Sequence, residues 1–104
     1  MLIEVLYVPG CPNREPAIDR LKEALRSESV AVAIQEIQVT GETMARSLLF
    51  PGSPTIRVNG MDVEPTGQMS VGLACRLYSN GSGVPQEERL RHAISKAKAA
   101  EGKA

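Results

Sequence analysis

The chain has 104 residues, enough for one packed domain and too few for two. Hydrophobic residues make up 42% and charged residues 23%, a balance typical of a globular protein and not of a disordered or fibrous one. Twelve basic residues balance twelve acidic ones, so no net field attracts nucleic acid or an anionic membrane. We therefore expect a single domain over residues 1–104 that binds neither.

The first half of the chain predicts two strands and two helices. Residues 2–8 are almost all apolar in both side-chain phases, as in a strand covered on two faces. Residues 13–27 carry apolar side chains at helical spacing. Residues 30–39 are rich in β-branched side chains and predict a second strand with a bulge. Residues 42–50 predict a short helix, ended by a proline and a glycine, whose inward side chains are Met44, Leu48 and Leu49.

The clearest local signal is the pair Asn59-Gly60, which is the preferred sequence for a two-residue hairpin turn. The turn fixes which residues face each other across the two strands. One face of the hairpin is then apolar, and the other carries a pair of opposite charges. The predicted pairs are Val58 with Met61, Arg57 with Asp62, and Ile56 with Val63.

The rest of the chain predicts loops until its last helix. Residues 65–72 form a polar loop, residues 73–78 an apolar patch of uncertain structure, and residues 79–83 a second loop. Pro85, followed by two acidic residues, is typical of a helix start, and the end after Lys98 is expected to fray. The inward side chains of this helix are Leu90, Ala93, Ile94 and Ala97.

The predicted elements define an α/β fold. A strand, a helix and a second strand make a right-handed parallel crossover, and a later hairpin makes the sheet mixed. We therefore expect a mixed four-stranded sheet flanked by helices, in the order βαβ-α-ββ-α.

The chain shows no signs of secretion or membrane insertion. No run approaches the roughly 20 apolar residues that cross a bilayer. The first eight residues lack a basic leader and include Glu4. Two cysteines are too few for a secreted disulfide scaffold, and a reducing compartment keeps both as thiols. We expect a cytoplasmic protein.

Cys11 is the main candidate for chemistry, because it lies between the first predicted strand and helix. Free N–H groups and partial positive charge at a helix start stabilise a thiolate, and Arg14 adds a nearby cation. With Asn13 as the helix cap, Pro16 falls harmlessly in the first turn and Cys11 lies two residues outside the helix. The opposing interpretation is a small thiol buried under the end of the strand.

Two segments, PGCPNR at residues 9–14 and GSPT at residues 52–55, resemble the thioredoxin-like superfamily. The resemblance covers essentially the whole chain in element order and implies a thioredoxin-like fold. In that family the first cysteine is the nucleophile, and a cis-proline before the hairpin lies against it and shapes the substrate groove. By position these residues are Cys11 and Pro54. Arg14 stands where the family has its second cysteine, so exchange within the motif is not available.

The resemblance also implies that residues around Cys11 bind the partner. These are Pro12 and Arg14, beside it in the sequence, together with Ser53 and Pro54. X-Pro bonds are mostly trans, so only the resemblance predicts a cis bond at Pro54. A cis bond would turn the backbone of Ser53 toward Cys11 and offer its N–H and C=O to an extended partner, as an added strand. More narrowly, the chain looks like small bacterial thioredoxin-like proteins, some of which carry mercury-lyase labels.

Cys75 has two interpretations. It could be a resolving thiol that attacks a mixed disulfide on Cys11, which requires α-carbons within about 7 Å. Its apolar neighbours Leu73, Ala74 and Leu77 favour instead a buried, inert side chain.

Three functions follow from these residues. The first is single-thiol disulfide exchange through Cys11, with small thiols or an extended segment of a protein partner. The second is a non-catalytic binding module, and the third is thiolate handling of a soft metal such as mercury by Cys11 and Cys75. No cofactor and no structural metal is expected, because two cysteines and an outward His92 do not make a zinc site. The oligomeric state is not predicted.

Overall fold

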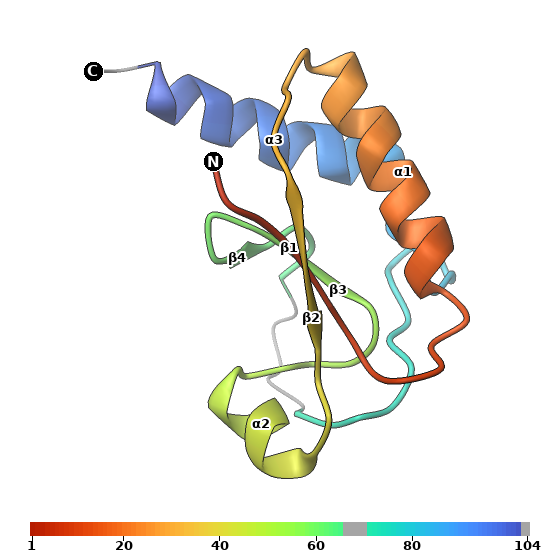
Figure 1. The fold of residues 1–104 in the computed structure, drawn as a ribbon. Coiled ribbons are helices and arrows are strands. Elements are labelled where there is room, and N and C mark those ends of the chain that lie inside the picture. The colour runs from red at the N-terminus through yellow and green to blue at the C-terminus, as the bar shows by residue number, and fades with distance from the viewer. Residues whose placement is uncertain (66–70, 103–104) are drawn as a thin grey trace.

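The computed structural model describes residues 1–65 and 71–102, and it has the predicted order of elements (Figure 1). The sheet order is β2-β1-β3-β4, with β1 parallel to β2 and antiparallel to β3. The predicted α/β fold with a mixed four-stranded sheet and three helices is confirmed. Residues 66–70 of the predicted polar loop and residues 103–104 lie outside the described residues. The elements are β1 (Ile3–Tyr7), α1 (Arg14–Ser27), β2 (Ile34–Gln38), α2 (Glu42–Ser47), β3 (Thr55–Val58), β4 (Met61–Asp62) and α3 (Glu87–Glu101).

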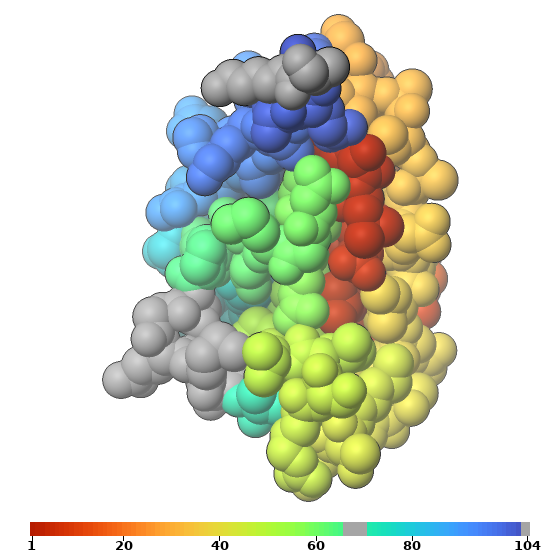
Figure 2. All heavy atoms as spheres, turned by 90° about the vertical axis from the view of Figure 1, so that its left-hand side faces the viewer, coloured from red at the N-terminus to blue at the C-terminus, as the bar shows by residue number. Residues whose placement is uncertain are grey.

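The two faces of the sheet are covered unequally. Helices α1 and α3 pack together over one face, where they enclose the main core. Helix α2 covers one end of the other face, and Figure 2 shows atoms of β1 and β3 at the surface between α2 and α3. Leu6 of β1 is buried under α2, whereas Leu2 is 45% exposed. The expectation of a strand covered on both faces therefore holds only for the second half of β1.

Two helices end in a way that the sequence patterns did not predict. After α2, Phe50 N–H donates to Ala45 O at 2.8 Å, and Leu49 takes a left-handed φ of 50°. This Schellman-type ending buries Phe50 and leaves Leu49 55% exposed, so the prediction that Leu49 faces the core is wrong. After α1, Val30 N–H donates to Leu25 O at 2.9 Å in the same manner. Val30 thus belongs to a helix ending, and β2 begins only at Ile34.

The helix termini differ from the predictions in two further respects. Helix α1 begins after Asn13 as predicted, but the Asn13 side chain does not cap it. A Cβ built at Gly83 would lie 2.1 Å from Asn13 Nδ2, so the amide packs against the Gly83 backbone instead. Helix α3 continues to Glu101, beyond the expected point of fraying at Lys98. None of the described helices is both long and apolar enough to cross a membrane.

The hairpin has the predicted turn and register. Asn59 and Gly60 both have positive φ angles, 52° and 80°, as a two-residue turn of this type requires. Val58 pairs with Met61 and Arg57 with Asp62, and Val63 N–H donates to Ile56 O. The side chains depart from the prediction. Met61 is 65% exposed, and Arg57 donates to the carbonyls of Leu48 and Leu49 after α2 and not to Asp62.

Replacing Asn59 tests the turn. Asn59→Ala should lower the free energy of unfolding by about 1–2 kcal/mol, because an alanine is strained in the left-handed region. It also removes the acceptor of the Leu2 N–H bond, which is 2.8 Å long. Asn59→Gly is the matched control, since glycine accepts the same φ but lacks the acceptor. Urea unfolding should show a much smaller loss for the glycine variant; equal losses would contradict a conformational origin.

Candidate functional site

Cys11 lies in the turn that connects β1 to α1, and it is half-buried. Its N–H donates to Val8 O at 3.2 Å, and its carbonyl accepts the N–H of Arg14 at 3.4 Å. Gly10, with a φ of 75°, provides the left-handed residue that reverses the chain before it. The turn therefore fixes the backbone of Cys11 directly before the helix and leaves part of the residue accessible.

The guanidinium of Arg14 is engaged by groups other than the thiol. Its Nε and Nη2 donate to Glu36 Oε1 of β2 at 3.0 and 2.5 Å. Its Cζ lies 4.3 Å from the centroid of the Tyr7 ring. The hydrogen bond to Glu36 raises the pKa of Arg14 above its ordinary value. The positive charge of Arg14, which was expected to act on Cys11, is thus paired with the carboxylate of Glu36.

Ser53 ties the turn of Cys11 to the segment before β3. Its Oγ accepts the N–H of Val8 at 3.0 Å, and Val8 O in turn accepts the N–H of Cys11. The peptide bond between Ser53 and Pro54 is cis. The structure therefore brings Cys11 and the Ser53-Pro54 pair to one end of the sheet, beyond the last residue of β1.

The other side of Ser53 is bonded to the segment that carries Cys75. Ser53 N–H donates to Ala74 O at 3.0 Å, and Ser53 O accepts the N–H of Arg76 at 2.9 Å. These two bonds make a parallel bridge between Ser53 and Cys75. The expectation that Ser53 offers both backbone groups to an extended partner is therefore wrong. The chain's own segment already uses them, and Ser53 is fully buried.

Arg76 anchors this segment from the interior. Only 5% exposed, it donates Nη1 to Asp62 Oδ2 at 2.6 Å and Nη2 to Oδ1 at 3.0 Å, a bidentate ion pair. It also donates to the Thr55 hydroxyl and to the Glu64 carbonyl. Burial alone would lower the pKa of Arg76, but the hydrogen bond to Asp62 and the nearby acidic groups outweigh it and raise the pKa. The guanidinium is thus a permanently charged cross-link between the segment and the hairpin.

Tyr78 makes a second anchor. Its hydroxyl donates to Pro54 O at 2.7 Å, and its ring lies under the Arg76 guanidinium at 4.2 Å. Burial raises the pKa of Tyr78 far above its ordinary value, and Arg76 offsets this only in part. The phenol therefore stays neutral and keeps its donor. We call residues 74–78, with their anchors Arg76 and Tyr78, the strap.

Cys75 is exposed, contrary to the prediction of a buried side chain. Its neighbours Leu73 and Leu77 are 37% and 73% exposed. The physical reason is that Arg76 and Tyr78 take the interior positions of this segment. The residues that alternate with them, Cys75 and Leu77, therefore face outward. Both cysteines are free thiols.

The sequence pattern did not indicate the anchors, because residues 73–78 are predominantly apolar. It also assigned Asp62 to Arg57 from the cross-strand register, which is correct for the backbone. The Asp62 carboxylate instead points to Arg76. One available signal was the presence of Arg76 and Tyr78 within an otherwise apolar stretch, since such residues need partners when they are buried.

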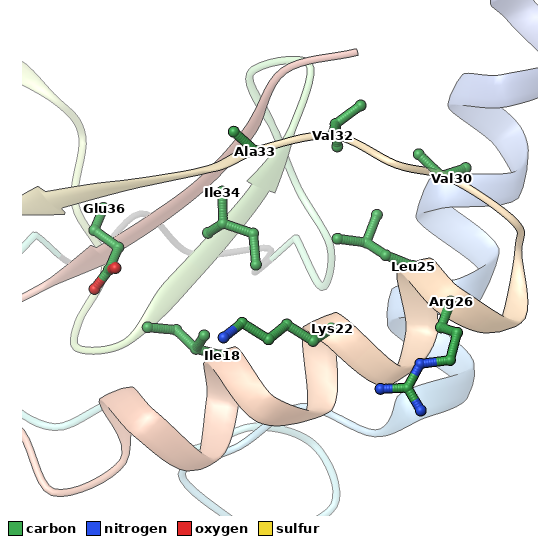
Figure 3. Close-up of a pocket in the computed structure, with 9 residues that line it drawn as sticks. All are labelled: Ile18, Lys22, Leu25, Arg26, Val30, Val32, Ala33, Ile34 and Glu36. Atoms are coloured by element: carbon green, nitrogen blue, oxygen red, sulfur yellow. The ribbon is translucent and has the colours of Figure 1, made fainter.

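A separate groove of about 520 Å³ lies between α1 and the chain that enters β2 (Figure 3). Lys22 lies on the α1 side of the groove and Ile34 on the opposite side, and Glu36 lies at one end. None of the six predicted site residues lines this groove. Its side opposite α1 includes Val30, Val32 and Ala33, which follow the Schellman-type ending of α1.

The described residues include no group of three or more histidine, cysteine or acidic side chains that could hold a metal ion. His92 is exposed on α3. Comparison of the chain with family models, curated proteins and solved structures finds no match. The site must therefore be interpreted from its own residues.

Asp62→Asn tests the anchor of the strap. It should lower the free energy of unfolding by about 3 kcal/mol, because it leaves a buried guanidinium without its counter-charge. The matched control is Glu42→Gln, which removes an exposed pair with Arg46 at 4.0 Å and should change stability by no more than about 0.5 kcal/mol. Chemical unfolding followed by circular dichroism measures both. Similar small losses would show that the buried pair does not stabilise the fold.

Proposed function

We propose that the chain is a thioredoxin-like thiol protein in which Cys11 exchanges disulfides and Cys75 resolves the product. The order of elements and the sheet order β2-β1-β3-β4 support the family resemblance. The observation that carries the proposal is the position of Ser53 between the two thiol segments. Its hydroxyl bonds Val8 in the turn of Cys11, and its backbone bridges to Cys75.

The proposed reaction has two steps. The Cys11 thiolate attacks a disulfide, forms a mixed disulfide, and releases one thiolate of the substrate. The Cys75 thiolate then attacks the sulfur of Cys11, forms an internal disulfide, and releases the second substrate thiolate. Two electrons pass from the protein dithiol to the substrate disulfide, and an external thiol must reduce the protein again. The partial exposure of Cys11 and the exposure of Cys75 support both attacks.

A second candidate is binding of a soft cation, such as the mercuric ion, by the two thiolates. The two free thiols, carried by segments that both bond to Ser53, favour it, because soft ions bind thiolate sulfur. This candidate predicts a one-to-one mercuric complex that is lost when either cysteine is replaced.

Mild oxidation with oxidised glutathione tests the exchange. Mass spectrometry of the wild-type chain should find a Cys11–Cys75 bridge, whereas Cys75→Ser should stop at a glutathione adduct on Cys11. Cys11→Ser should form no internal bridge, and any adduct on Cys75 should form more slowly than the adduct on Cys11. If Cys75 reacts first and Cys11 stays unmodified, the assigned roles are wrong.

A further inference from the structure

We infer that the site acts on small disulfides and does not favour disulfides within extended peptides over them, because the strap already bonds the backbone groups of Ser53 that an added peptide strand would need. This inference rests on the proposed function of Cys11 and specifies its substrate class.

An extended peptide adds to a sheet by bonding the free N–H and C=O groups of an edge. At Ser53 both groups are bonded to Ala74 and Arg76. Beyond Ser53, β3 has β1 on one side and β4 on the other. In the described part of the chain, the backbone groups of Ser53 are therefore not free to pair with an added strand.

The strap is held against Ser53 by contacts that a competing peptide would have to break. Release of the strap would separate Arg76 from Asp62 and leave both charges without their partners. It would also break the bond from Tyr78 to Pro54 O. The fit is close, since a Cβ on Gly52 would lie 3.0 Å from Arg76 Cβ. A peptide that competed for Ser53 would have to displace all of these contacts.

Both cysteines remain at least partly exposed while the strap is in place. Cys11 is half-buried and Cys75 is exposed, so a disulfide can reach sulfur without pairing to the backbone. In-line attack on a disulfide needs access to one sulfur atom and a thiolate leaving group. A low-molecular-weight disulfide meets these requirements, and the added length of a peptide contributes no favourable contact at Ser53.

The test compares two probes on Cys75→Ser, which isolates the attack by Cys11. One is N-acetylcysteine amide joined by a disulfide to 5-thio-2-nitrobenzoate, and the other is an extended peptide with the same disulfide on its central cysteine. Attack forms a mixed disulfide on Cys11 and releases the coloured aromatic thiolate, the better leaving group. The peptide should react no more than about twofold faster than the small probe. A larger preference for the peptide overturns the inference and leaves the proposed function standing.

A loosened strap provides the second measurement. Tyr78→Phe, made in the same background, removes the hydroxyl that holds Pro54 O while it keeps the ring over which Arg76 stacks. It should raise the reactivity of the peptide relative to the small probe by about threefold or more, because the edge at Ser53 opens more often. Leu77→Ala, which changes an exposed side chain of the strap, should leave the ratio unchanged.

The outcomes distinguish the role of the strap from the proposed function of Cys11. An unchanged ratio in Tyr78→Phe overturns the role of the strap, even if the small probe reacts well. If Cys11 reacts with neither probe faster than a free cysteine in an unfolded peptide, the proposed function itself fails, and the substrate class fails with it.

Discussion

Arg76 holds a full positive charge in the interior because both carboxylate oxygens of Asp62 lie against it. A buried guanidinium without such a partner would be strongly destabilising. The pair therefore determines how the irregular chain after the hairpin must run. It places Cys75 at the surface and the backbone of its neighbours against Ser53. Through Ser53 and Val8, the same constraint reaches the turn that contains Cys11.

Much of the fold was predictable from local signals. The Asn59-Gly60 pair fixes a register, and apolar spacing locates α1 and α3. Element ends were less predictable, because they depend on which residue takes a left-handed conformation. Leu49 does so after α2, and no local preference of leucine indicates it. Burial of Phe50 by the core decides that choice, and burial is a property of the assembled fold.

The candidate site, too, was predictable only in part. The position of Cys11 before a helix followed from the alternation of strand and helix, and the structure places it there. The surroundings of the thiol did not follow, since the partners of Arg14 and Arg76 come from distant parts of the chain. The cross-strand register suggested that Arg57 would pair with Asp62. The carboxylate of Asp62 instead binds Arg76, which is more deeply buried. Which of several arginines pairs with a given carboxylate depends on the assembled fold and cannot be resolved from spacing alone.

The contact between Asn13 and Gly83 has a consequence for how this sequence can vary. Gly83 is required there for the space it leaves, because any side chain would collide with the Asn13 amide. An enlargement at position 83 would therefore be tolerated only together with a smaller residue at position 13. The loop that leads into the last helix is thus coupled, across most of the chain's length, to the residue two places beyond the thiol.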